Sequence, residues 1–243
     1  MSDTIPFRAS DHPSPHPHLL IASTGSVATI KLPQILHALS TYNVSIRLLL
    51  TSSALQFLSG QSPEQPHYTA LLSIPNVSGI HLDADEWHPS WTRNAPILHI
   101  ELRRWADAML VAPCSANMLA KVTNGLADNL VTSVARAWDT TGAIDGVRKS
   151  MEETRTAEGL KRMWIAPAMN TAMWLHPVTG RQMAVLEGWG EEQGGWIKLL
   201  RPIEKGLACG DVGGGAMMEW ADIVHNVVAG LHLKRGPEST TDG

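Results

Sequence analysis

The fold is decided by the stretch DAMLVAPCSANMLAKV (107–122), in which an apolar run ends at a proline and then a serine. After Asp107, residues 108–113 are continuously apolar, so the segment 107–113 predicts a strand whose two faces are both buried. Ser115 stands where helix caps stand, and helical sequence follows to Trp138. A buried strand that passes directly into a helix predicts one unit of a parallel α/β sheet.

Five more apolar segments of the same kind flank this one. They are HLLIAST (18–24), VSIRLLL (44–50), VSGIHLD (77–83), RMWIAPA (162–168) and WIKLL (196–200). Between the first two, residues 32–39 carry leucine and isoleucine at the spacing of a helix face, and residues 223–231 repeat that spacing near the end of the chain. The alternation predicts the α/β class, a three-layer sandwich with a six-stranded parallel sheet between helices.

Composition excludes several classes of protein. The chain has 243 residues, 44% of them hydrophobic, and a net charge of −4, which indicates a globular protein with little affinity for nucleic acid. No apolar run reaches the ~18–20 residues of a membrane helix. The beginning of the sequence lacks the pattern of a signal peptide, so no membrane contact is expected. Two cysteines form no disulfide framework, which favours a cytoplasmic location.

We expect one domain over residues 18–233, between two tails. Residues 1–17 hold four prolines and predict a disordered N-terminal tail, in which two histidines have nothing to hold them as metal ligands, so no metal site is expected. Residues 234–243 predict a flexible C-terminal tail. Residues 139–161 are charged and lack clear periodicity, which predicts a solvated insertion loop.

Small and hydroxyl side chains follow three of the predicted strands. They lie in the turns Thr24-Gly25-Ser26, Thr51-Ser52-Ser53 and Ser115-Ala116-Asn117. Each turn can cap a helix or hold a phosphate. Ligands of parallel sheets bind beyond the carboxyl ends of the strands, so three such turns at one edge favour a mononucleotide-type cofactor. Neither a GxGxxG fingerprint nor a P-loop is present.

His99 lies in ILHIELRRWAD (97–107) and is either a structural histidine or a general base. The charged residues that follow it, Glu101, Arg103 and Arg104, could orient its ring or offset an anionic ligand. Trp87 and Trp91 precede it and predict either an aromatic wall beside a ligand or packing between subunits.

Two segments later in the chain also carry candidate groups. Asn170 ends the strand predicted over 162–168 and is either a turn residue or a ligand of a carboxylate. The glycine-rich stretch 206–217 is either a plain flexible connection or a mobile flap on which Cys209 carries a thiol acid. Cys114, which abuts the buried strand, is predicted to be an inert apolar residue.

Together these segments resemble the homo-oligomeric flavin-containing cysteine decarboxylases. The matching stretches are GSVATIK (25–31), LHIELRRWAD (98–107), APCSANMLAKVTNGLADNL (112–130), APAMNTAMW (166–174) and LACGDVGGGAM (207–217). The resemblance implies a Rossmann-like or flavodoxin-like subunit, FMN as cofactor, and a homotrimer with active sites at subunit interfaces. It implies decarboxylation of (R)-4′-phospho-N-pantothenoylcysteine to 4′-phosphopantetheine, a step of coenzyme A biosynthesis.

The resemblance also assigns roles by position. His99 is implied as the catalytic base, Asn170 as the residue that binds the substrate's carboxylate, and Cys209 as the proton donor. Ala208 and Met217 are implied beside the substrate. The implied FMN contacts are Gly25, Ser26, Val27, Thr51, Ser53, Ser115, Ala116, Asn117, Met118 and Ala168.

Two other functions stay open at this point. Fungal relatives act as halotolerance-type regulatory subunits that inhibit a type 1 protein phosphatase, and some of them work only in mixed trimers with paralogues. The presence of His99, Asn170 and Cys209 in one chain favours a self-sufficient homotrimer. A protein like the flavin prenyltransferases would share the fold, but the stretch GDVGGGAM (210–217) argues against it.

Overall fold

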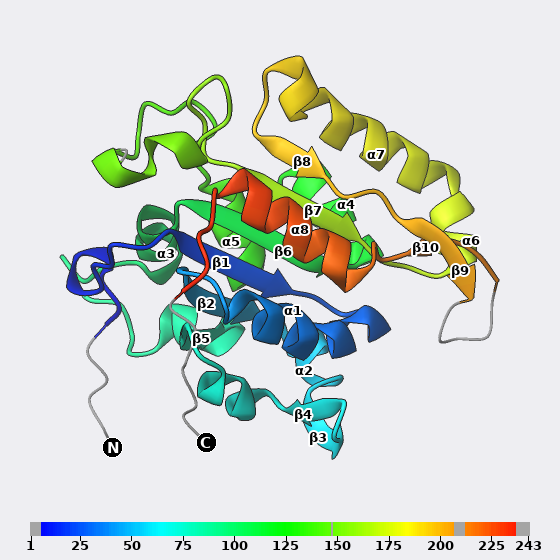
Figure 1. The fold of residues 1–243 in the computed structure, drawn as a ribbon, viewed down its shortest axis with the longest axis horizontal. Helices are drawn as coiled ribbons and strands as arrows, with labels where there is room; N and C mark the ends of the chain where they lie inside the picture. Colours follow the sequence, from blue (N-terminus) through cyan, green and yellow to red (C-terminus); the bar gives the residue numbers. More distant parts are fainter. Residues whose placement is uncertain (1–5, 147, 207–211, 237–243) are drawn as a thin grey trace.

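A parallel sheet of six strands forms the centre of the protein (Figure 1). The computed structural model describes residues 6–146, 148–206 and 212–236. The six strands are β1 His18–Ser23, β2 Ser45–Leu50, β5 Val77–Leu82, β6 Ala108–Cys114, β7 Met163–Pro167 and β8 Ile197–Leu199. Each strand predicted from the sequence is confirmed, and its ends differ by one residue at most.

The order of the strands places a topological switch in the middle of the sheet. The order is β5-β2-β1-β6-β7-β8, so the chain winds outward from β1 in one direction and from β6 in the other. Doubly wound sheets bind ligands in the crevice that opens where the winding reverses. The topology therefore points to the carboxyl ends of β1 and β6.

Helices cover both faces of this sheet because successive strand residues point to opposite sides. Leu19 and Ile21 pack with α1 and α8 on one face, while Leu20 and Ala22 pack with α3, α4, α5 and α7 on the other. Figure 1 views the sheet from the side of α1 and α8. The helices are α1 Leu32–Leu39, α3 Leu98–Trp105, α4 Ala116–Asn124, α5 Leu130–Arg136, α7 Pro177–Gly188 and α8 Trp220–Gly230. The three-layer sandwich expected from the sequence is confirmed.

Short elements fill the connections. Two are single turns of α-helix, α2 Ser52–Leu55 and α6 Thr171–Leu175. Two are antiparallel hairpins, β3 Ser59–Ser62 with β4 Gln65–His67 and β9 Ile203–Gly206 with β10 Val212–Ala216. The 3-10 helices are η1 Ala9–Asp11, η2 Val27–Lys31, η3 Tyr68–Ser73, η4 Asp83–Trp87, η5 Lys149–Thr154 and η6 Glu191–Gln193. Within the described residues, no helix is long and apolar enough to span a bilayer.

The described part of the N-terminal stretch packs on the domain, which differs from the disordered tail expected from its prolines. The guanidinium of buried Arg47 lies 4.4 Å from the centre of the Phe7 ring, and the Phe7 ring stacks on His12. The backbone N–H of Ala9 donates to Glu101 at 2.9 Å. A cation–π contact and a charge-assisted hydrogen bond thus fix residues that composition alone marks as a tail.

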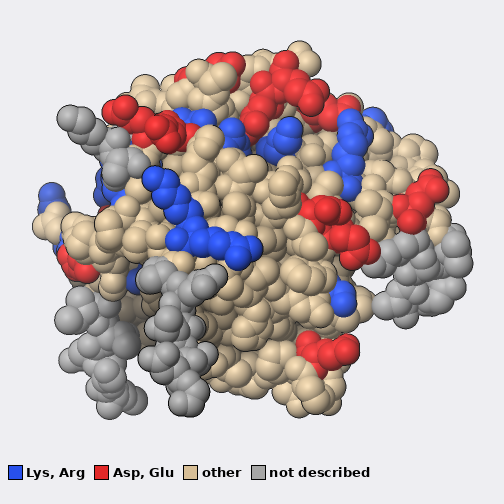
Figure 2. All heavy atoms as spheres, in the orientation of Figure 1, with Lys and Arg blue, Asp and Glu red and all other residues tan. Residues whose placement is uncertain are grey.

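The described residues of the segment 139–161 also belong to the packed domain, which differs from the solvated loop expected from its charges. The Asp139 carboxylate is fully buried and accepts hydrogen bonds from four backbone N–H groups between residues 141 and 145. Lys161 is 1% exposed and donates to Asp145 at 2.6 Å. Charged residues of this segment that do face solvent, such as Glu152 and Glu158, contribute to the upper margin of the surface in Figure 2, where acidic side chains gather. The sequence shows the charges of this segment, but no periodicity shows that backbone N–H groups satisfy Asp139 or that Lys161 pairs with Asp145.

Candidate active site

A cavity of about 560 Å³ opens at the carboxyl edge of the sheet, where the winding reverses. Its walls come from the segments that follow β1, β2, β6 and β7 and from the end of β10. The volume lies within the ~300–1,000 Å³ of small-molecule and cofactor sites. The lining is mostly apolar with a few hydroxyl and amide groups, a composition that binds an aromatic ring system and fixes its orientation.

The turn after β1 approaches the turn after β2 so closely that only glycine fits. A Cβ atom on Gly25 would lie 2.6 Å from the hydroxyl oxygen of Ser53. The next residue, Ser26, caps η2 by accepting from the N–H of Ala28 at 3.4 Å. Gly25, Ser26, Val27 and Ser53 all line the cavity, as the resemblance implies.

The segment after β6 holds both a helix cap and an exposed amide. Ser115 caps α4 by accepting from the N–H of Met118 at 3.2 Å, and its own N–H donates to the hydroxyl of Thr24 at 2.8 Å. Ser115, Ala116 and Asn117 line the cavity. Asn117 is exposed, and its amide makes no hydrogen bond to the described residues, so both its donors and its acceptor can meet a ligand.

Two of the implied cofactor contacts lie behind the cavity wall. Thr51 is 6% exposed; it caps α2 by accepting from the N–H of Ala54 at 3.3 Å, and its hydroxyl lies 3.1 Å from that of Ser53. Met118 is 2% exposed and belongs to the core beneath α4. Neither lines the cavity, so Thr51 acts on it through Ser53 and Met118 through packing.

The end of β7 presents an amide whose orientation is fixed by a helix. The Oδ1 atom of Asn170 accepts from the N–H of Met173 at 2.8 Å, which caps α6. Because the cap uses the acceptor, the Nδ2 group keeps both of its donors for a ligand. Asn170 is exposed and lines the cavity beside Ala168 and Met169, which are buried.

Part of the glycine-rich segment forms a strand, whereas the sequence predicts a flexible connection or a mobile flap. Residues 212–216 form β10, which pairs with β9 and packs against α6. Gly215 has φ 105°, and a Cβ atom there would lie 2.7 Å from the carbonyl oxygen of Met169. Glycine is therefore required for close approach to the cavity wall. Met217 lines the cavity, whereas Ala208 and Cys209 lie outside the described residues.

His99 does not line this cavity. It lies in the first turn of α3, where its Nδ1 atom is 2.6 Å from Oε1 of Glu86, a residue of η4. The expected orienting residues are engaged elsewhere. Glu101 accepts from Ala9 and Arg104, and Arg103 pairs with Asp145 at 2.9 Å.

Some lining residues were not predicted from the sequence. Lys31 and Phe57 lie at the turns after β1 and β2, and Glu219 and Trp220 stand at the beginning of α8. Lys31 ends the quoted stretch 25–31, so its position was a usable signal. Phe57, Glu219 and Trp220 reach the cavity only through the tertiary fold, and no local sequence pattern marks them. The same is true of Glu86, which lies beside His99 outside the cavity.

The buried cysteine behaves as predicted. Cys114 is 1% exposed, and burial raises the pKa of its thiol to about 12, so it stays protonated and unreactive. Among the described residues, no three His, Cys, Asp or Glu side chains are grouped so as to hold a metal ion.

The sequence and fold match known proteins over most of the chain. Residues 8–232 match the model of the family described as Flavoprotein, and the chain belongs to this family. A phosphopantothenoylcysteine decarboxylase of Arabidopsis thaliana is 41% identical over 204 residues, which are 84% of this chain and 79% of that protein. A probable thymidylate synthase of Schizosaccharomyces pombe is 40% identical over 219 residues, 90% of this chain but 30% of that protein. This chain thus spans less than a third of that longer relative.

Solved structures give the same result. A cysteine-to-serine variant of PPC decarboxylase, complexed with pantothenoylaminoethenethiol, superimposes with a TM-score of 0.68 at 39% identity, covering 88% of this chain and 97% of that chain. The FMN binding protein AtHal3 superimposes with a TM-score of 0.65 at 39% identity, covering 88% of this chain and 95% of that one. Within its family, the chain is therefore similar to decarboxylases of phosphopantothenoylcysteine.

Proposed function

We propose that this protein is an FMN-dependent decarboxylase that converts (R)-4′-phospho-N-pantothenoylcysteine to 4′-phosphopantetheine in coenzyme A biosynthesis, in the cytoplasm. The observation that carries the proposal is the cavity at the switch point, where Asn170 presents two oriented donors beside a lining of small, hydroxyl and methionine side chains. Relatives of that activity match the chain over most of their length.

The residues present fit FMN. A glycine turn without a Cβ, the hydroxyls of Ser26, Ser53 and Ser115, and the unpaired amide of Asn117 supply hydrogen-bonding groups for a phosphate, a ribityl chain and a ring edge. Ala168 and the methionines supply an apolar wall for the ring. When bound, FMN supplies reversible hydride transfer, which makes the substrate's cysteinyl group an electron sink for the loss of CO₂.

Asn170 binds the substrate's carboxylate before CO₂ leaves. The cap to Met173 restrains the amide of Asn170, which lines the cavity, so less side-chain entropy is lost when its two N–H groups bind the carboxylate. The apolar neighbours Ala168, Met169 and Met217 exclude water around that carboxylate. Cys209, with Ala208 beside it, is proposed to deliver the proton that completes the saturated product.

We further propose that His99 reaches the cavity of a neighbouring subunit in a homotrimer. Two apolar surfaces of the described chain support this. One holds Trp87, Trp91 and Ile97, 67%, 52% and 36% exposed, just before His99; the other holds Met173 and Leu175 of α6, 50% and 74% exposed, beside the cavity. Two different apolar patches on one chain suit a head-to-tail interface, which closes into a ring.

The absorption spectrum of the purified protein tests the proposal. A flavin spectrum is expected, together with conversion of phosphopantothenoylcysteine to phosphopantetheine. His99→Asn should keep FMN and release no CO₂, and Cys209→Ser should stall after CO₂ loss. A colourless protein without decarboxylase activity that inhibits a type 1 phosphatase would overturn the proposal in favour of the regulatory function.

Subunit mixing tests the interface. His99→Asn and Asn170→Asp subunits, each inactive alone, should regain part of the activity after they are unfolded and refolded together. Complementation requires that His99 and Asn170 of one site come from different chains. A mixture as inactive as either variant would mean that His99 and Asn170 of one site belong to the same subunit. Refolding a variant together with a paralogue, and measuring whether activity returns, tests for mixed trimers.

A further inference from the structure

The strongest feature outside the cavity is the pair formed by Glu86 and His99. Oε1 of Glu86 accepts a hydrogen bond from Nδ1 of the His99 ring at 2.6 Å, and Oε2 accepts from the backbone N–H of the same histidine at 3.2 Å. One carboxylate thus holds both the ring and the backbone of one residue. An ionised carboxylate cannot donate, so the proton of this bond belongs to Nδ1.

Burial makes the pair directional. The Glu86 side chain is 5% exposed, whereas that of His99 is 23% exposed. The carboxylate therefore lies behind the ring, and the ring extends from it toward the surface. With Nδ1 used by Glu86, the free ring nitrogen is Nε2, which in this tautomer carries a lone pair and can accept a proton.

The segment that presents Glu86 is itself fixed at three points. Oδ1 of Asp83 accepts from the N–H of Leu130 at 3.2 Å, and Oδ2 accepts from the N–H of Ser52 at 3.2 Å. Asp85 accepts from the N–H of Leu82 at 2.7 Å and caps η4. The three acidic residues of DADEW (83–87) thus have separate tasks: Asp83 anchors η4 between α2 and α5, Asp85 caps η4, and Glu86 holds His99.

Among the described residues, His99 is also the one residue that hydrogen-bonds to the Glu86 carboxylate. A carboxylate buried to this degree without a cation is costly unless its neighbours donate to it. The ring and backbone of His99 supply those donors. This exclusivity separates Glu86 from Glu101, whose oxygens serve Ala9 and Arg104.

We propose that Glu86 is the positioning residue for His99, holding the ring as the Nδ1–H tautomer so that Nε2 acts as the base. This inference rests on the proposed role of His99 in decarboxylation. Glu86 does not itself contact substrate; it fixes the tautomer and direction of a group that does, as carboxylates do for histidines at other sites.

Three variants separate positioning from mere folding. Glu86→Gln removes the obligatory acceptor, because its amide can instead donate to Nδ1 and select the other tautomer. Its kcat should fall about 10- to 100-fold, with KM and FMN content close to wild type. Glu86→Asp keeps a carboxylate and should recover part of the loss. Asp85→Asn, which keeps an acceptor for Leu82 and does not touch His99, is the matched control and should be fully active.

The ring nitrogens of His99 give a readout independent of turnover. In holoenzyme labelled with ¹⁵N-histidine, the signal missing from His99→Asn identifies residue 99, and its shifts should report Nδ1–H in wild type and the Nε2–H tautomer in Glu86→Gln. An Nε2–H tautomer in wild type, or full activity of Glu86→Gln, would overturn the inference. Full activity of His99→Asn would instead overturn the proposed function, so the two failures are distinguishable. If Glu86→Gln does not fold, the wild-type tautomer and Glu86→Asp decide.

Discussion

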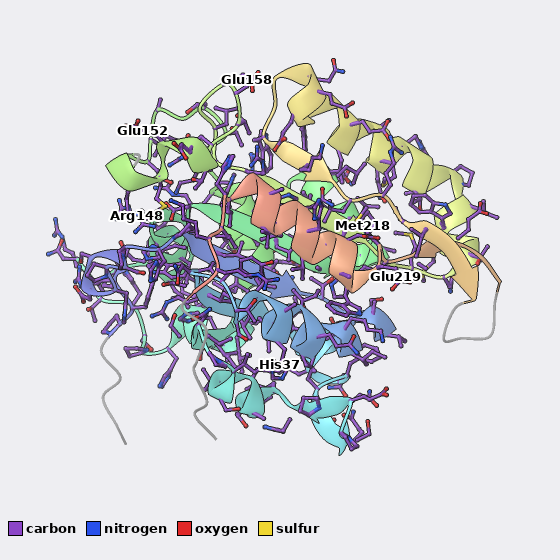
Figure 3. The ribbon with its side chains drawn as sticks, viewed as in Figure 1. His37, Arg148, Glu152, Glu158, Met218 and Glu219 are labelled. Carbon is purple, nitrogen blue, oxygen red and sulfur yellow. The ribbon has the colours of Figure 1, made fainter. Side chains whose placement is uncertain are left out.

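The two edges of the central sheet are built from different side chains. At the carboxyl edge the cavity is lined by glycine, hydroxyl, amide and methionine groups, with Lys31 and Glu219 as its charged residues. At the amino edge, buried ion pairs join Asp145 to Lys161 and Arg103, and the buried carboxylate of Asp107 pairs with the half-buried Arg148. Figure 3 marks these opposite ends by Met218 and Glu219 on one side and Arg148 on the other.

The difference follows from what each edge must do. A short neutral side chain can satisfy a helix end and still face a ligand, as Ser115 and Asn170 do. A buried charge needs a fixed partner, because burying an unpaired charge lowers the stability of the fold by roughly several kcal/mol. Charges therefore close the amino edge, while short polar groups leave the carboxyl edge open for chemistry.

Breaking the amino edge should cost the most stability. Asp145→Ala leaves Arg103 and Lys161 buried without their shared carboxylate, which should lower the free energy of unfolding by about 3–5 kcal/mol. Urea denaturation measures this loss, and the fraction that stays folded at low temperature should keep its kcat.

The matched control is Glu187→Ala, which breaks an exposed pair with Arg201 and should cost about 0–1 kcal/mol. Equal losses for the two variants would show that the amino edge is no more than a solvated surface.

How far the sequence predicts the two edges differs in the same way. The strands and the carboxyl edge follow from local patterns, because an apolar run, a small residue and a helix cap are adjacent in the chain, as at 107–122. The amino edge depends on Asp107 meeting Arg148, 41 positions away, and no periodicity encodes such a pair. The contact between Glu86 and His99 could not be predicted for the same reason, because the two residues are 13 positions apart and belong to different elements.

Capping also shows why alternatives from the sequence were not exclusive. Ser26, Ser115 and Asn170 each cap a helix and each line the cavity. A hydroxyl or amide at a strand end uses one lone pair for the cap and keeps its other groups free. In the sequence alone, a helix cap and a ligand contact are alternative roles for such a residue, but the geometry of the turns permits both.

A charge placed at the carboxyl edge should abolish most activity without harming the fold. Asn170→Asp keeps the acceptor for Met173 but turns the donors into a carboxylate facing the substrate's carboxylate. Like-charge repulsion of about 3–4 kcal/mol should lower kcat/KM roughly 10²- to 10³-fold with little change in Tm. Decarboxylation kinetics and calorimetry measure both.

Asn129→Asp is its matched control. Asn129 caps α5 through the N–H of Thr132 at 2.9 Å and does not line the cavity. Its conversion should leave kcat/KM at the wild-type value. A similar loss in both variants would trace the effect to helix capping instead of substrate binding.

Filling the glycine turn should weaken the cofactor more than the fold. In Gly25→Ala, the new Cβ atom meets Ser53 Oγ at 2.6 Å and Ser53 Cβ at 2.7 Å, so the two turns must separate. The Kd for FMN should rise about 10- to 100-fold, a cost of about 1.4–2.8 kcal/mol measured by titration of the apoprotein. Adding Ser53→Gly removes both contacts and should restore part of the affinity. Gly180→Ala, which has no neighbour within 4 Å, should bind FMN normally.

The smallest expected effect concerns pH and the amino edge. Burial, together with the positive charges of Arg148 and Arg47, lowers the pKa of His18 from 6.5 to about 4. The Nδ1 atom of His18 donates to the carbonyl of Trp105 at 2.8 Å. Its buried Nε2 atom has no hydrogen-bond partner among the described residues. Below pH 6.5 the unfolded chain binds a proton that the folded protein refuses until about pH 4, so stability falls as pH falls through that window. The loss should be about 1–2 kcal/mol after allowance for solvent relaxation. His18→Gln can still donate to Trp105 and should flatten the dependence of Tm on pH between about pH 4 and 6.5. If the slope of Tm against pH is unchanged in this variant, groups other than His18 cause the acid sensitivity.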